Sequence, residues 1–172
     1  MSERHPPVKA ISLYQMWASA VARGVKRVET RSWRTEYRGI LLIHASAKVP
    51  EDVAAWLDTD QPLRDLCAQH ELRHRDLPKG AVVGVAYLGG CLSTDSERLD
   101  EWIVRECAEP DDEYLLGDFS PGRHGWLLGA ACELRWPVKA RGYPGLWTPD
   151  DRLLAEVDRA GGGILSRLGV VV

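Results

Sequence analysis

A short segment of the sequence, GVKRVETRSW at residues 24–33, places four ionisable side chains close together. Lys26, Arg27, Glu29 and Arg31 lie within six positions of one another, in a chain whose net charge is −3. Ammonium and guanidinium groups bind phosphate and carbonyl oxygens, whereas a carboxylate accepts hydrogen bonds from the amino groups of a nucleobase. Because a nucleotide has both a phosphate and a base edge, this mixture of charges suits a nucleotide better than a simple anion.

The same segment allows two interpretations. In an extended strand over 25–31, Arg27, Glu29 and Arg31 share one face and Lys26 lies on the other. In the first interpretation this is a solvated edge strand whose charges pair with one another and add little stability. In the second, Lys26, Glu29 and Arg31 face a cleft beside the preceding helix, where they bind an anionic or polar ligand. In such a cleft, Lys26 and Glu29 would also form an acid/base pair.

A second pattern, HELRH at residues 70–74, fits the H-E-x-x-H motif of zinc hydrolases. That motif requires a helix that holds both histidines on one face, and a third ligand elsewhere. Here Pro78 follows closely, the neighbouring residues are polar or charged, and the sequence shows no third ligand. We therefore expect no metal site, and we interpret HELRH as the exposed end of a helix.

The elements that hold these residues can be predicted from periodicity and from helix boundary residues. We expect a strand at 8–13 and then a helix through YQMWASAVARG, with Ser12 and Gln15 as its capping box and Gly24 as its end. Further strands are expected at 40–46, in AVVGVAYLGGCL and in GWLLGAACELRW. Further helices are expected in VPEDVAAWLDTDQPLRDLCAQHELRH, in SERLDEWIVREC and at about 148–159. The first of these helices should break at Pro62. This irregular order favours an α+β fold with a small curled sheet over a doubly wound one.

Composition limits the classes of protein that fit. The 172 residues suit one domain, and the sequence has no signal peptide and no apolar run of membrane-spanning length, so we expect a cytoplasmic protein without a membrane partner. No two of the four cysteines form a C-x-x-C pair, which favours buried free thiols. Phosphate-binding and dinucleotide-binding glycine motifs and the G-x-S-x-G elbow do not occur, and we expect no cofactor.

The charge is unevenly distributed along the chain. Residues 1–48 contain nine Lys and Arg against three Asp and Glu, whereas the remainder is acidic. The sequence pI of about 6.0 argues against a uniformly basic nucleic-acid binder. Any binding of a nucleic acid would therefore depend on a local patch.

The segment ISLYQMWASAVARGVKRVETRSWRTEYRGILLIHASAK resembles the ASCH domain, a PUA-like domain named after activating signal cointegrator homology. The G-x-K-x-x-E-x-R hallmark of that family is present as Gly24, Lys26, Glu29 and Arg31. The resemblance continues through LPKGAVVGVAYL, LLGDFSPGRHGWLL and PVKARGYPGLW, and so covers residues 8–147. One departure is Met16, where many relatives have proline at the start of the helix.

The resemblance implies a small β-barrel of five or six strands flanked by helices, with a ligand cleft between the first helix and the barrel. It implies a single domain over 1–172, with a flexible tail at 1–7 and a C-terminal helix and apolar tail at 148–172. It also implies binding of RNA or a modified nucleotide. The alternative is a nucleoside- or RNA-directed hydrolase, either a ribonuclease or an amidohydrolase that acts on acylated cytidine, with Lys26 and Glu29 as catalytic groups. The amidohydrolase branch has a nucleophilic Thr at the position of Glu29, and a carboxylate cannot reproduce hydroxyl chemistry.

The residues expected to bind the ligand extend beyond the motif. They are Ser12, Gln15, Trp17, Lys26, Glu29, Arg31, Trp33, Arg38, Arg123 and Trp126. Tryptophan is suited to stacking on a base, although Trp17 and Trp126 equally suit a core. Arg38 and Arg123, with Arg34 and Lys48, would form a basic rim or simply be solvated surface charge. A third possibility is a protein-interaction role for the apolar end GILSRLGVVV.

Overall fold

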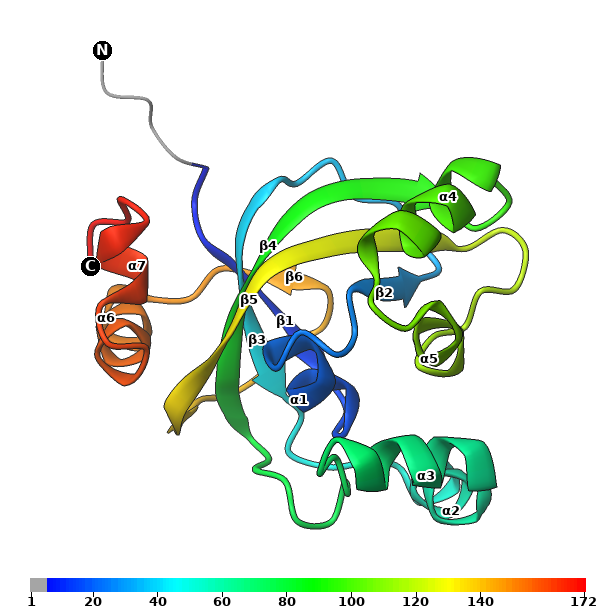
Figure 1. Cartoon of the computed structure of the whole chain (residues 1–172). Helices are drawn as coiled ribbons and strands as arrows, with labels where there is room; N and C mark the ends of the chain where they lie inside the picture. The colour runs from blue at the N-terminus through cyan, green and yellow to red at the C-terminus, as the bar shows by residue number, and fades with distance from the viewer. Residues whose placement is uncertain (1–5) are drawn as a thin grey trace.

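The computed structural model describes residues 6–172, and within that range six strands form one curled sheet (Figure 1). The strand order is β2-β5-β4-β3-β1-β6, in which β1 and β3 are parallel and the other neighbours are antiparallel. The strands are β1 Lys9–Leu13, β2 Val28–Arg31, β3 Gly39–Ala45, β4 Ala81–Ser93, β5 His124–Lys139 and β6 Leu146–Trp147. The sheet is a half-barrel, and the expected α+β fold with a small curled sheet is confirmed.

The two longest strands produce the curl. β4 and β5 pair along most of their length, and their register shifts at several points. Such irregularities bend a strand and increase its twist, which lets this long antiparallel pair of strands pass around the core. The central strand β3 is buried throughout, because apolar side chains on both of its faces are covered.

Helices cover both faces of the sheet and its lower end, as seen in Figure 1. They are α1 Trp17–Ala22, α2 Glu51–Thr59, α3 Gln61–Gln69, α4 Glu97–Glu106, α5 Pro110–Leu115, α6 Asp151–Ala160 and α7 Ile164–Arg167. Leu154, Val157 and Leu165 of α6 and α7 pack against one face, over Leu42 and Val85. The other face packs against α1, so the sheet separates two apolar cores.

Small side chains allow α1 to lie directly on the sheet. A Cβ atom at Gly84 of β4 would come within 2.4 Å of the Ala22 side chain, so this position requires glycine. Gly24 follows the helix with φ +74, which confirms it as the terminating residue. This close packing fixes the chain that leaves α1 and enters β2.

The predicted capping box at the start of α1 is wrong. The helix begins at Trp17, and Ser12 lies in β1, too early in the chain to cap it. Gln15 does contribute, because its side-chain oxygen accepts a hydrogen bond of 3.1 Å from the Ser19 amide. Its amide nitrogen donates to the Pro78 carbonyl at 2.7 Å, and so ties the start of α1 to the segment before β4.

The remaining elements follow the sequence with some differences. The break near Pro62 is confirmed, because α2 ends at Thr59 and the Asp60 side chain caps α3. Helix α5 was not expected from the sequence. At the C-terminus, α7 buries Leu165 against the sheet, so part of the apolar end packs within the domain, whereas Val171 is exposed. Residues 1–5 of the expected flexible tail lie outside the described residues.

Within residues 6–172, the structure contains no helix with both the length and the apolar character needed to cross a membrane.

Candidate functional site

A pocket of about 1,030 Å³ opens between the start of α1, the strand β2 and the loop at 140–145. Segments far apart in the sequence meet in its wall, including the ends of β1 and β3 and the chain that follows α5. Its lining residues are Ser12, Leu13, Tyr14, Trp17, Glu29, Thr30, Arg31, His44, Ser46, Ala47, Trp56, Leu115, Leu116, Gly117, Asp118, Ala140, Arg141, Gly142, Tyr143, Pro144 and Gly145. The mixture of aromatic, charged and backbone polar groups is typical of a small-molecule site.

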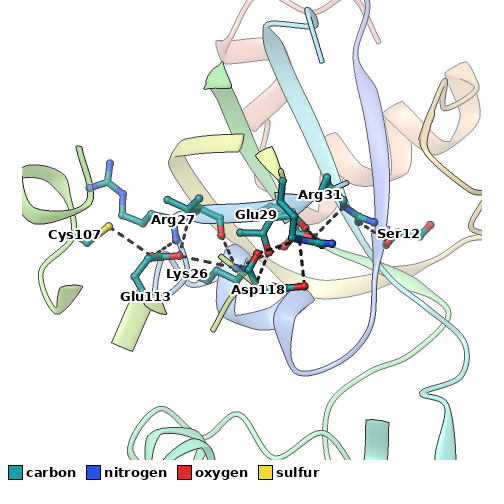
Figure 2. A network of polar contacts seen from close by, with 11 residues as sticks. Ser12, Lys26, Arg27, Glu29, Arg31, Cys107, Glu113 and Asp118 are labelled. Atoms are coloured by element: carbon teal, nitrogen blue, oxygen red, sulfur yellow. Dashed lines mark hydrogen bonds and ion pairs between the residues drawn. The ribbon is translucent and has the colours of Figure 1, made fainter. Parts of the chain in front are cut away.

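Glu29 and Arg31 line this pocket from β2, and Figure 2 shows the two side chains next to each other. The Glu29 Oε1 atom lies 3.1 Å from Arg31 Nε, and Arg31 donates through Nη2 to the Ser12 carbonyl at 3.3 Å. Since residues i and i+2 of a strand share a face, β2 places both side chains on the pocket side, as the sequence predicts. The guanidinium is thus held at the wall by a carboxylate and a carbonyl.

One donor of this guanidinium has no acceptor. The buried Nε–H of Arg31 makes no hydrogen bond within residues 6–172, although Glu29 is close enough for an ion pair. The Glu29 oxygen is near in distance but out of line with the N–H direction. That atom is enclosed by protein, so a ligand in the pocket would contact the exposed part of the Arg31 side chain, which is 27% exposed overall.

Lys26 lies beneath the pocket wall and is only 1% exposed. Its ammonium group donates to the Val28 carbonyl and lies 3.7 Å from Glu29 Oε2 and 4.0 Å from Glu113 Oε1. Figure 2 shows this ammonium between the two carboxylates. Lys26 therefore places one buried positive charge between two carboxylates and holds Glu29 in place, while Glu29 itself faces the pocket.

Glu113, on α5, supports the entry to β2. Its two carboxylate oxygens accept hydrogen bonds from the backbone amides of Arg27 at 2.7 Å and Val28 at 2.9 Å. The thiol of Cys107 lies 3.6 Å from the same carboxylate, and burial together with this negative charge raises the pKa of Cys107 to about 12. Glu113 thus fixes the position of the motif segment.

A chain of hydrogen bonds ties β1, β3 and the 140–145 loop together. His44 Nε2 lies 3.0 Å from the Ala140 carbonyl and Nδ1 lies 3.1 Å from Ser12 Oγ, while Trp147 Nε1 donates to Ser12 Oγ at 3.3 Å. A carbonyl only accepts, so Nε2 carries the proton of the neutral ring and Nδ1 accepts from the Ser12 hydroxyl. Burial lowers the pKa of His44 below its usual value, which favours this neutral form.

Gly142 allows the loop to approach this chain of hydrogen bonds. A Cβ atom at Gly142 would lie 2.4 Å from His44 Cε1 and 2.6 Å from Ser12 Oγ. The backbone of the loop therefore lies directly on the two side chains. On the same loop, the Arg141 guanidinium lies 5.4 Å from the Tyr143 ring centroid. Both of these side chains line the pocket.

Of the predicted ligand-binding residues, four line the pocket: Ser12, Trp17, Glu29 and Arg31. The other six lie outside its lining: Gln15, Lys26, Trp33, Arg38, Arg123 and Trp126. The roles assigned to all ten in ligand binding stay predictions.

Three of the outlying residues support the wall rather than face the cavity. Trp126 is completely buried, and its indole N–H donates to the Trp33 carbonyl at 3.3 Å. The Trp33 ring contacts Trp126 edge-on, with centroids 4.6 Å apart. Arg123 pairs with Asp118, which lines the pocket, at 3.3 Å. Arg38 instead donates to the carbonyls of Thr35 and Tyr37 in its own loop.

The fold brings to the site several residues that belong to no motif recognised in the sequence. They are His44, Trp56, Glu113, Asp118, Arg141 and Tyr143. A lone histidine inside the apolar run ILLIHAS was a recognisable sign of a role for His44. Trp56 offered no such sign, because it lies in an amphipathic helix far along the chain from the motif.

The HELRH segment does not form the helical motif that zinc hydrolases need. Helix α3 ends at Gln69, and Glu71 has a left-handed backbone with φ 55. His74 Nε2 instead contacts Asp58 at 3.0 Å. No group of three potential ligands within the described residues could hold a metal ion. All four cysteines are free, and Cys67 and Cys107 are buried.

The curled mixed sheet with a helix beside its pocket defines an α+β half-barrel protein. Residues 11–134 match the family model of the ASCH domain, and the chain belongs to this family. Over 145 residues, or 83% of this chain, it is 31% identical to Activating signal cointegrator 1 of Homo sapiens and 30% identical to that of Mus musculus. The match covers 22% of the length of each, so the chain spans about a fifth of these curated relatives.

Solved structures support the same fold. The crystal structure of ASCH from Zymomonas mobilis matches with a TM-score of 0.52 at 16% identity, over 88% of this chain and 94% of that chain. A mutant form of that protein matches with a TM-score of 0.51 at 18% identity, over the same shares of the two chains. At these identities the likeness shows the fold.

Proposed function

We propose that this domain binds RNA or a nucleotide in the pocket beside α1. The observation that supports the proposal most is the Glu29–Arg31 pair at the pocket wall, where an anionic and a cationic side chain line the same cavity. Arg31 would donate to a phosphate or carbonyl oxygen, and Glu29 would accept from a base amino group. This division of roles uses both charges and gives a nucleotide two points of recognition.

The buried charges behind the wall support this proposal. Lys26 lies 3.7 Å from Glu29 and so helps to hold the carboxylate that faces the pocket in position. The ammonium itself is buried and bonded to the Val28 carbonyl. In our proposal Lys26 therefore acts through Glu29 and does not contact the phosphate.

Arg31→Ala tests the proposal, with a fluorescently labelled ten-nucleotide single-stranded RNA of randomised sequence as the probe. Loss of a charged hydrogen-bond donor should weaken binding by about 10- to 150-fold. If Arg31 contacts a phosphate, the slope of log affinity against log salt should also fall by about 0.7. Arg152→Ala is the matched control, because Arg152 is exposed and pairs with Glu156 on α6, which packs on the opposite face of the sheet from α1. Equal affinity and salt slope in wild type and Arg31→Ala would contradict the proposal.

The second candidate is a nucleoside- or RNA-directed hydrolase. It is favoured by the 3.7 Å contact between Lys26 and Glu29, since Glu29 reaches the pocket and could exchange a proton with a bound substrate. Incubation with acylated cytidines and with total RNA, followed by mass spectrometry, tests this candidate. A product that forms with wild type and not with Glu29→Gln would support an enzyme, and absence of product with retained ligand would support a binding domain.

A further inference from the structure

Two tryptophan rings from different helices lie together in the pocket wall. Trp17 begins α1 and Trp56 lies on α2, and their ring centroids are 6.0 Å apart with an angle of 15° between the planes. Both side chains line the pocket, and Trp56 is 45% exposed. Large aromatic side chains left open in a concave surface are typical of a binding site, because a core would cover them.

The backbones that hold the two rings are fixed by packing. Each residue of α1 after Trp17 is buried. Next to Trp56, Leu57 is buried in the same apolar cluster as Met16. The two rings are therefore stacked on each other at a defined place in the wall, and a base that stacks on the open part of Trp56 orders little additional protein.

The charged groups of the pocket complement this surface. Glu29 and Arg31 line the same cavity as the two rings, so a ligand there meets both a flat apolar wall and a polar pair. A nucleobase has this combination of an apolar face and a polar edge. A ligand of this pocket must therefore have an accessible base face as well as polar groups that bind Glu29 and Arg31.

We infer that Trp17 and Trp56 form a stacking surface for an unpaired nucleobase, and that the pocket therefore takes single-stranded nucleic acid or a free nucleotide and rejects a duplex. Inside a duplex both faces of a base are covered by its neighbours and its pairing edge is occupied. Only an unpaired base can stack on Trp56 and present its edge to Glu29. The inference rests on the proposed function and specifies its ligand.

The test compares three probes and three variants. The probes are the randomised ten-nucleotide single strand, a hairpin whose ten-base-pair stem is closed by a polyethylene glycol linker so that it has no unpaired base, and a mixture of the four ribonucleoside monophosphates. The variants are Trp56→Ala, Trp56→Phe and, as a matched control, Trp136→Ala, because Trp136 is 47% exposed on β5 and lies outside the pocket lining. The dissociation constant of each protein variant for each probe is measured at the same salt concentration.

If the inference is correct, we expect the single strand to bind at least about tenfold more tightly than the hairpin. Removing a stacking ring should weaken binding of the single strand by about 5- to 150-fold in Trp56→Ala, with a smaller loss in Trp56→Phe and none in Trp136→Ala. Monophosphates that bind as tightly as the single strand would identify a free nucleotide as a sufficient ligand, and weaker binding would identify a polymer. Either result agrees with an unpaired base.

The failures of the two hypotheses can be told apart. If Arg31→Ala loses binding while Trp56→Ala binds as wild type does, the stacking inference is wrong and the proposed function stands. Equal or tighter binding of the hairpin would also overturn the inference alone. If wild type binds none of the three probes, the proposed function fails and the inference fails with it.

Discussion

The buried ammonium group of Lys26 lies 3.7 Å from the carboxylate of Glu29, which faces the pocket. On the far side of the same ammonium lies Glu113, and on the far side of Glu29 lies Arg31. The hallmark motif of the family thus contributes two side chains to the pocket wall and one cation that stabilises them from behind. We make four predictions, which concern this arrangement of charges, His44 and the 140–145 loop.

Lys26→Met should strongly destabilise the fold. The change leaves the Glu29 and Glu113 carboxylates without their buried cation and the Val28 carbonyl without its donor. Breaking a buried pair from one side costs about 3–5 kcal/mol, which urea unfolding would measure as a loss in the free energy of unfolding. Arg34→Met removes an exposed pair with Glu36 and should cost less than about 1 kcal/mol. Equal losses in the two variants would contradict the role of Lys26.

Glu113→Gln should destabilise the entry to β2. The Arg27 and Val28 amides donate to different oxygens of Glu113, and glutamine replaces one of these oxygens with an NH₂ group, so one buried N–H loses its acceptor. The expected loss is about 1–3 kcal/mol in the free energy of unfolding. Glu109→Gln, in the same acidic segment but exposed, serves as the control and should leave stability within about 0.5 kcal/mol. No difference between the two would show that the Glu113 hydrogen bonds contribute little.

His44 should make stability depend on pH in a defined window. Its pKa is lower in the folded protein than the usual 6.5, because burial disfavours the charged ring. Below pH 6.5 the unfolded chain therefore binds a proton that the folded protein does not, and stability falls as pH falls. For one residue the slope is at most about 1.4 kcal/mol per pH unit. Above pH 6.5 both states have a neutral ring, and this contribution is constant.

NMR titration of the His44 ring measures this directly, and His44→Gln supplies the comparison for the unfolding curves. The variant should show a flatter dependence of the free energy of unfolding on pH between about 5 and 6.5, since glutamine does not titrate. A His44 pKa at or above 6.5, or an unchanged slope in the variant, would refute the prediction.

Gly142→Ala should displace the 140–145 loop. The added methyl group would lie 2.4 Å from His44 Cε1 and 2.6 Å from Ser12 Oγ, so the loop or the two side chains must move. Overpacking of this kind lowers the free energy of unfolding by about 1–3 kcal/mol. It should also weaken the binding of any ligand that lies between the loop and β2. Gly129→Ala is the control, because no atom lies within 4 Å of a Cβ at that position. A Gly142→Ala protein that unfolds and binds as the control does would show that the loop tolerates the methyl group.

The sequence by itself determined most of the local structure and the family. Periodicity and boundary residues located the strand before α1, the end of α1 at Gly24 and the break before α3. These features are local, because hydrophobic spacing, helix ends and turns depend on residues a few positions apart. The motif itself was also visible, since its four positions lie within one turn and one strand.

Only the tertiary structure decided which of these side chains reach the pocket. Strand alternation places Lys26 and Glu29 on opposite faces, but only the fold decides that the Glu29 side lines the cavity and that the Lys26 side is buried. That difference depends on Glu113, whose carboxylate attracts the ammonium from a helix distant in sequence. Trp56 and His44 likewise reach the site through packing between distant segments. Local spacing does not encode such contacts, because the free energy that selects them comes from burial and pairing across the whole fold.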